Sequence, residues 1–260
     1  MKIASWNING VKARLETVLK WLEEEQPDVA CFQEIKSVDE NFPRAPFEEL
    51  GYNLETHGQK GFNGVAILSK RPFEEVNRRL PGEDEDEQAR YIEAVIAGDN
   101  EPIRVGCLYL PNGNPVETEK FPYKLRWMDR LHKHAVKQLE KEEAFLLVGD
   151  YNVIPEPEDA KKPEAWVGDA LFRPESRQRF RALLNLGFTE AVRATNATAG
   201  TYTFWDYQAG AWQRDNGIRI DHLLLSPEAA RIMQGVGIDK HVRGWEKPSD
   251  HVPVWVELSA

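Results

Sequence analysis

Acidic, amide and imidazole side chains stand next to several apolar segments of this sequence, at the points where strands would begin or end. Asp250 and His251 directly precede the apolar run 252–258, and Asp221 lies within the run 218–226. If Asp221 accepts a hydrogen bond from one ring nitrogen of His251, the other nitrogen is free to donate to a phosphoryl oxygen. Such a donor stabilises charge that grows in a transition state. A surface pair is the alternative, but the apolar residues after His251 favour a sheet edge over the core.

Two pairs of polar residues have a spacing that suits water or phosphate binding. Asp150 and Asn152 follow the apolar run 144–148, and Asn7 and Asn9 follow the run 2–6. Residues i and i+2 of an extended segment point to the same side, so an acceptor and an amide can hold one water or phosphate and aim a nucleophile. The alternative is an Asx turn that closes the strand. The spacing leaves both interpretations open.

Glu34 follows the predicted strand 28–33 and is the candidate ligand for a divalent cation. Mg²⁺ takes few carboxylates and keeps several waters, so Glu34 with Asn9 or a nearby aspartate would suffice. A single carboxylate of this kind can also be an exposed charge at a strand end, and only agreement among several strand ends favours the metal site. Zinc-type His/Cys spacing, a nucleophile elbow, a P-loop and a dinucleotide fingerprint are absent.

The hydrophobic pattern predicts the elements that would position these groups. Helical spacing predicts helices over 11–22, 125–139 and 180–186. Strands are predicted at 2–6, 28–33, 52–56, 64–69, 91–97, 103–110, 144–148, 201–205, 218–226 and 252–258, with those between 52 and 110 in an antiparallel meander. Two sheets packed face to face, with helices outside, would bury every one of these apolar faces. The predicted fold class is therefore α/β.

Composition predicts one domain over residues 1–260, because no linker, repeat or break divides the chain. A chain with 41% hydrophobic and 29% charged residues is not disordered. The net charge of −10 argues by itself against a polyanionic partner. Five acids, however, form the run 83–87, which is typical of a solvated loop, and basic residues recur in predicted loops, Lys161, Lys162 and Arg214 among them. A local phosphate-binding face is therefore compatible with the sequence.

A cytoplasmic protein is expected. The first predicted strand begins at Lys2, which leaves no room for a secretory signal, and no apolar stretch approaches the length of a membrane span. Cys31 and Cys107 lie in apolar strand patterns, so two buried, reduced thiols are favoured over a disulfide.

Seven motifs, in order along the chain, resemble the bacterial exonuclease III family. The same motifs are similar to the wider endonuclease/exonuclease/phosphatase superfamily, of which DNase I is a member. They cover residues 5–10, 32–36, 61–66, 109–113, 149–152, 219–221 and 249–251. The stretches 6–10, 109–113 and 203–207 favour the branch that acts on abasic sites.

The resemblance implies a four-layer α/β sandwich, with two mixed, mainly antiparallel sheets flanked by helices, that hydrolyses phosphodiesters with Mg²⁺ or Mn²⁺. By position, Glu34 would bind the metal with help from Asn9, and Asp250 would tune the metal site. Asp150 would activate or orient the attacking water, and Asp221 would orient His251. The scissile phosphate would be held by Asn7, Asn152 and His251, with Tyr109 and Asn112 beside it.

A pocket for a flipped, base-free sugar needs aromatic and aliphatic walls that reject a full nucleotide. Phe204, Trp205, Ile218 and Ile220 are the candidates, and Arg219 between the last two is a candidate substrate contact. Ordinary core packing is the alternative for each apolar residue. Some relatives carry Asp at the position of Asn9 or Trp at the position of Ile218.

The predicted function is a monomeric DNA repair nuclease. It would incise duplex DNA on the 5′ side of an abasic site, degrade 3′ ends and clean blocked 3′ termini, by in-line attack of an activated water. One rival is a phosphatase or phospholipase of the superfamily, which the acidic net charge supports and the stretches 109–113 and 203–207 oppose. The other is a catalytically silent nucleic-acid-binding module, although every expected catalytic position holds a competent residue.

Overall fold

The computed structural model describes all 260 residues and contains two six-stranded sheets packed face to face. The first sheet has the strand order β11 (Met233–Ile238), β12 (Val254–Leu258), β1 (Lys2–Asn7), β2 (Val29–Gln33), β4 (Val65–Ser69) and β3 (Asn53–His57). The second has the order β5 (Phe73–Arg78), β6 (Tyr91–Ile96), β7 (Ile103–Tyr109), β8 (Phe145–Asp150), β10 (Asp221–Leu225) and β9 (Thr189–Glu190).

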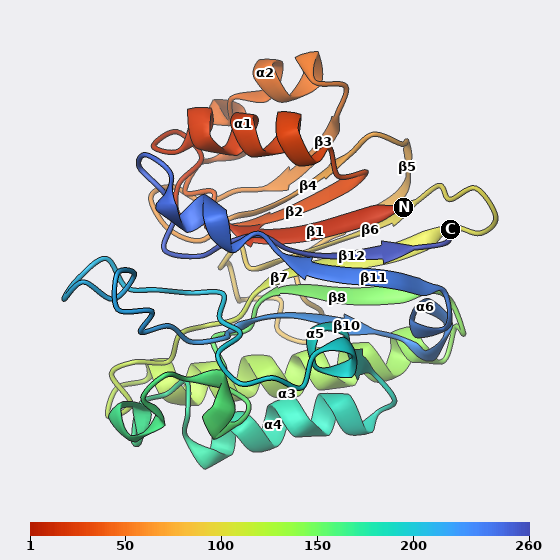
Figure 1. The fold of residues 1–260 in the computed structure, drawn as a ribbon. Coiled ribbons are helices and arrows are strands. Elements are labelled where there is room, and N and C mark those ends of the chain that lie inside the picture. Colours follow the sequence, from red (N-terminus) through yellow and green to blue (C-terminus); the bar gives the residue numbers. More distant parts are fainter.

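Helices cover the outer faces of both sheets (Figure 1). On the first sheet lie α1 (Leu15–Glu25) and α2 (Arg44–Glu49), and on the second lie α3 (Lys120–Leu139) and α4 (Pro174–Asn185). Two short helices, α5 (Ala191–Thr195) and α6 (Pro227–Arg231), lie near β10. Single turns of 3₁₀ helix occur at Asp39–Asn41, Pro157–Asp159, Pro163–Trp166 and Lys240–Gly244. The predicted four-layer α/β sandwich is confirmed.

The alternation of residues along β1 and β2 explains the layers. Ile3 and Val29 point into the core between the sheets, whereas Trp6 and Phe32 point toward α1 and α2. Both faces of these strands are apolar because both are covered, and successive strand side chains point to opposite faces. A third cluster, which includes Trp127 and Phe180, fills the layer between the second sheet and its helices.

Two parallel pairs place the functional end of the molecule. β1 pairs with β2 and β7 pairs with β8 in parallel, and all the other pairs are antiparallel. Parallel neighbours need a crossover, which α1 and α3 provide. The carboxyl ends of β1 and β2, and likewise those of β7 and β8, therefore lie side by side.

The predicted meander between residues 52 and 110 is wrong as a single unit, because these strands belong to two sheets. β3 and β4 form a hairpin in the first sheet, whereas β5, β6 and β7 form a meander in the second. Sequence analysis missed β5, β9, β11, α2, α5 and α6. β9 has only two residues, and α5 and α6 have five each. β5 is a partly exposed edge strand of mixed polarity, β11 contains two glycines, and α2 has only six residues.

The predicted strand 201–205 is also wrong. Phe204 makes only isolated bridges, to Ile218 and to His251. The predicted strands 218–226 and 252–258 begin later than expected, at Asp221 and Val254. Residues 217–220 exchange backbone hydrogen bonds with loops instead, as between Arg219 N–H and the Asp159 carbonyl. Cys31 and Cys107 are buried free thiols, as predicted. None of the helices has both the length and the apolar character needed to cross a bilayer.

Candidate active site

One buried amide connects the two halves of the site. Asn7, the last residue of β1, donates through Nδ2 to Glu34 Oε1 and to Asp150 Oδ2, both at 2.9 Å. The backbone N–H of Asn9 donates to Asn7 Oδ1 at 3.0 Å, which fixes the orientation of the Asn7 amide. Carboxylates that follow strands of different sheets are thereby brought together.

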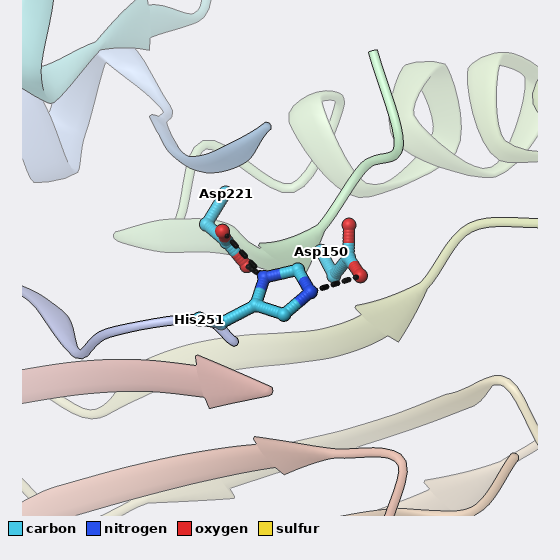
Figure 2. Close-up of side chains that lie close together, drawn as sticks. All are labelled: Asp150, Asp221 and His251. Atoms are coloured by element: carbon cyan, nitrogen blue, oxygen red, sulfur yellow. Dashed lines mark hydrogen bonds and ion pairs between the residues drawn. The ribbon is translucent and has the colours of Figure 1, made fainter. Parts of the chain in front are cut away.

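His251 lies between two aspartates (Figure 2). Its Nδ1 is 2.9 Å from Asp221 Oδ2, and its Nε2 is 3.6 Å from Asp150 Oδ2. Burial lowers the pKa of His251, but the charges of Asp221 and Asp150 outweigh burial and raise it to about 10. The ring is therefore held as an imidazolium, with Nε2–H directed toward Asp150.

Neighbouring strand and loop residues hold this histidine and Asp221 in place. Trp6 Nε1 donates to the His251 carbonyl at 3.0 Å, and the His251 N–H donates to Ser249 Oγ. Thr203 Oγ1 accepts hydrogen bonds from the backbone N–H groups of Ile220 and Asp221. Sequence analysis gave Ser249 and Thr203 no role beyond membership of a motif, because only the fold shows what their hydroxyl groups contact.

Asp150 and Glu34 have oppositely shifted pKa values. Burial, together with the charge of Asp221, raises the pKa of Asp150 to about 7. Burial also acts to raise the pKa of Glu34, but the hydrogen bond from Asn7 and the charge of Lys36 outweigh burial and lower it. Two carboxyl groups whose pKa values are pushed apart can take different chemical roles.

The two polar pairs, Asp150 with Asn152 and Asn7 with Asn9, form Asx turns and also face the site. The Asn152 N–H donates to Asp150 Oδ1 at 2.9 Å, and Asn9 makes the equivalent contact with Asn7. Asn152 Nδ2 donates one hydrogen to the Leu110 carbonyl, which leaves its second hydrogen available to a ligand. The two interpretations of this spacing are therefore compatible.

The predicted metal ligands lie in one chain of contacts with Lys36. Lys36 Nζ is 2.6 Å from Asn9 Oδ1 and 3.3 Å from Glu34 Oε2, and Asn9 Nδ2 is 3.4 Å from Asp250 Oδ1. Glu34 and Asn9 thus present oxygen atoms that already attract a cation. Hard oxygen donors of this kind suit Mg²⁺ or Mn²⁺.

Ligand atoms of Asp150, Asp221 and His251 lie within 4.8 Å of one another, so these residues could in principle hold an ion. We favour Glu34 instead, because the imidazolium of His251 would repel a cation and its Nδ1 is already bonded to Asp221.

Four residues of the site have left-handed backbone conformations. Asn9, Glu34, Lys36 and Asn152 have φ values of 47°, 50°, 52° and 46°. Asparagine tolerates this region, whereas each of the other two residues costs about 1–3 kcal/mol. Such strain persists only where the surrounding strands and turns hold the backbone, and here it directs the side chains to one point.

Tyr109 and Asn112 complete the group. Tyr109 hydrogen-bonds to Glu34, and burial and the nearby charges of Glu34 and Asp150 raise its pKa. Exposed Asn112 donates to Asn152 Oδ1 at 3.4 Å. The structure therefore brings together ten of the predicted site residues, namely Asn7, Asn9, Glu34, Tyr109, Asn112, Asp150, Asn152, Asp221, Asp250 and His251.

A recess of about 460 Å³ lies beside the histidine. It is lined by Phe204, Ile218 and Trp166, among others, and the Phe204 ring lies 5.0 Å from the His251 ring. Two of the predicted wall residues do not reach it. Trp205 is fully buried against Tyr202 and Trp212, and Ile220 packs in a small core cluster, so for both the alternative of core packing is correct.

The expectation that Arg219 contacts substrate is also wrong. Its side chain is 1% exposed, with Nε 2.8 Å from Asp159 Oδ1 and a second nitrogen 2.9 Å from Glu190 Oε2. The nitrogen that pairs with Glu190 also contacts Nδ1 of buried His222, at 3.2 Å. Strand alternation turns the arginine inward, where the two carboxylates neutralise it.

Arg219→Met should lower the free energy of unfolding by about 3–5 kcal/mol, because it leaves Asp159 and Glu190 buried without this partner. Urea denaturation measures the loss. Arg181→Met, which removes an exposed partner of Glu156, is the control and should cost less than about 1 kcal/mol. Unchanged stability with a raised KM for DNA would restore Arg219 as a substrate contact.

Comparison with known proteins agrees with this geometry. The profile of the Endonuclease/Exonuclease/phosphatase family matches residues 4–251. The chain belongs to this family. It is 37% identical to "Exodeoxyribonuclease III" of Haemophilus influenzae, over 99% of this chain and 100% of that protein.

Two solved structures each match over 100% of both chains. An AP endonuclease from Archaeoglobus fulgidus has a TM-score of 0.94 at 37% identity. The 3′ phosphatase NExo from Neisseria, bound to product DNA hairpin, has a TM-score of 0.96 at 35% identity. The predicted DNA repair nuclease of the endonuclease/exonuclease/phosphatase family is confirmed at this level.

Proposed function

We propose that this chain is a divalent-metal-dependent phosphodiesterase that incises duplex DNA on the 5′ side of abasic sites and also trims and cleans 3′ ends. The observation that carries the proposal is the single buried site in which Asn7 joins Glu34 to Asp150, and Asp150 lies against the Asp221–His251 pair. Similarity to an exodeoxyribonuclease III, an AP endonuclease and a 3′ phosphatase supports the substrate class.

Asp150 is the residue assigned to the attacking water. Its carboxylate is buried, its Oδ1 is aligned by the Asn152 N–H, and its pKa near 7 suits proton transfer at neutral pH. His251 Nε2–H lies 3.6 Å from the same carboxylate and would supply a charged donor to the phosphate. Asn7, Asn152, Asn112 and Tyr109 border the same space and would position the phosphate oxygens. The site thus works by positioning and by neutralising charge in an in-line displacement.

Glu34, Asn9 and Asp250 are the residues that would hold the cation. When bound, Mg²⁺, or Mn²⁺ in its place, would supply Lewis-acid stabilisation of the phosphate charge. The ammonium group of Lys36 contacts Glu34 and Asn9 and so adds a positive charge next to the proposed cation site.

The recess beside His251 supports selection of a base-free sugar. Phe204 and Ile218 offer apolar surface to one face of a deoxyribose, and the Phe204 ring also contacts the ring of His251. We infer that residues 1–260 act as one catalytic domain, because the core between the sheets takes residues from both. The expectations of a monomer and of a cytoplasmic location stay predictions.

The test is a duplex oligonucleotide with one abasic analogue, incubated with Mg²⁺, with Mn²⁺ or with chelator. We expect one cut on the 5′ side of the lesion that leaves a 3′-hydroxyl, and none in chelator. Glu34→Gln should raise the Mg²⁺ concentration needed for half-maximal activity by roughly tenfold or more, because it removes a charged ligand. Glu23→Gln, an exposed change on α1, is the control.

Release of inorganic phosphate from a 3′-phosphorylated end in the same assay measures the end-cleaning activity. Failure of the intact protein to cut any of these DNA substrates would overturn the proposal. An unchanged Mg²⁺ requirement in Glu34→Gln would overturn only the assignment of the metal ligand.

A further inference from the structure

A completely buried lysine, Lys124, lies directly behind the site. It comes from the first turns of α3, and its side chain has no exposed surface. Its Nζ donates to the backbone carbonyls of Asn152, at 2.5 Å, and Asn112, at 3.1 Å. Sequence analysis did not single it out, because a lysine among the apolar positions of a helix gives no sign of which carbonyl groups it will meet.

The ammonium has no carboxylate partner. It is influenced by the charges of Asp150 and Asp169 but forms an ion pair with neither. Burying an ammonium group without a paired carboxylate costs free energy, and such lysines are rare in protein interiors. A functional role for Lys124 would explain this burial. Burial lowers the pKa of Lys124 to about 7, although the two aspartates act in the opposite direction. The negative charge of a phosphodiester bound nearby would favour the protonated form further.

The two carbonyl groups belong to the loops that follow β7 and β8. The loop after β7 carries Asn112 and the loop after β8 carries Asn152, and these side chains contact each other at 3.4 Å. A Cβ added at Gly113 would lie 2.7 Å from Lys124 Cδ and 3.1 Å from Ala170 Cβ. The backbone therefore closes tightly around the lysine stem.

We propose that Lys124 is a positioning residue, whose ammonium group holds the Asn112 and Asn152 loops at the spacing that the phosphate requires and places an unneutralised positive charge behind that phosphate. This inference rests on the proposed function, because it presumes that a phosphodiester binds beside Asp150. Negative charge accumulates on the phosphoryl oxygens during displacement, so the ammonium acts more strongly on the transition state than on the bound substrate.

The test compares Lys124→Met, Lys124→Gln and Lys124→Arg in steady-state kinetics on the abasic duplex, with saturating Mg²⁺. In Lys124→Met we expect kcat to fall by about tenfold, less than the roughly 10²-fold loss expected for a donor that touches the phosphate itself. KM should change little. Lys124→Arg, which keeps the charge, should recover part of the lost kcat. Lys133→Met, an exposed change on the same helix, is the matched control.

A merely structural role would give a different pattern. If Met and Arg lowered kcat equally, or if Met left kcat at the wild-type value, the proposal would be overturned. If Lys124→Met fails to fold, Lys124→Gln replaces it, because glutamine keeps a hydrogen-bond donor without the charge. A wild-type kcat in Lys124→Gln would also overturn the proposal. Failure of the wild-type protein to cut DNA would instead overturn the proposed function together with this inference.

Discussion

Asp150→Asn should reduce kcat/KM for abasic-site incision by roughly 10²- to 10⁴-fold, the range expected when a general base is lost. The asparagine has nearly the same shape and can keep the hydrogen bond from the Asn152 N–H, but it cannot take a proton from water. Because burial raises the pKa of Asp150 to about 7, wild-type activity should also fall as the pH drops below that value, where the carboxylate becomes protonated.

The measurement is incision of the abasic duplex at saturating Mg²⁺ across a pH series. Asp129→Asn is the matched control, because Asp129 is an exposed carboxylate on α3 that contacts Arg179. The acid-side loss should disappear in the residual activity of Asp150→Asn. Retention of substantial activity in that variant, or an unaltered acid limb, would remove Asp150 from the role of base.

His251→Gln should lower kcat by roughly 10²- to 10³-fold, as expected for the loss of one donor to the developing phosphoryl charge. Since neighbouring carboxylates raise the pKa of His251 to about 10, the wild-type enzyme should keep its activity through mildly alkaline pH, where a free histidine would be neutral. The protonated ring and the ionised Asp150 are thus present together between about pH 7 and about pH 10.

Asp221→Asn gives the sharper test of the same pair. Removing a negative neighbour that lies 2.9 Å from Nδ1 should lower the pKa of His251, so activity should be lost at a lower pH than in the wild type. His241→Gln, a change at an exposed residue of the 3₁₀ turn Lys240–Gly244, is the control for loss of a histidine. An alkaline limb that does not move in Asp221→Asn would contradict the arrangement of charges described above.

Much of the site could be predicted because its residues follow strands. A strand is recognisable from a local apolar pattern, and the polar residue after it lies at a sheet edge whatever the rest of the fold does. Glu34 after β2 and Asp150 at the end of β8 were identified in this way, and the order of the motifs indicated the family. The internal strands, apolar on both faces, were also identified correctly, whereas the edge strands β5 and β11 were missed because their patterns are mixed.

The inward direction of a charged side chain could not be predicted from local pattern. Arg219 and Lys124 are both buried cations, one neutralised by carboxylates from Asp159 and Glu190 and the other held by two carbonyl groups. All of these partners are distant in the sequence. The same holds for Trp205, which the fold places in the core and not in the recess.

The sequence by itself determined the residue types at the strand ends, and with them the oxygen ligands, the imidazole and the class of chemistry. Only the tertiary structure decided that one Asn7 amide joins Glu34 to Asp150, that two carboxylates keep His251 protonated, and which charges are buried. The physical reason is that side-chain chemistry is local, whereas distance, burial and the pKa shifts they cause depend on segments that meet only when the two sheets pack together.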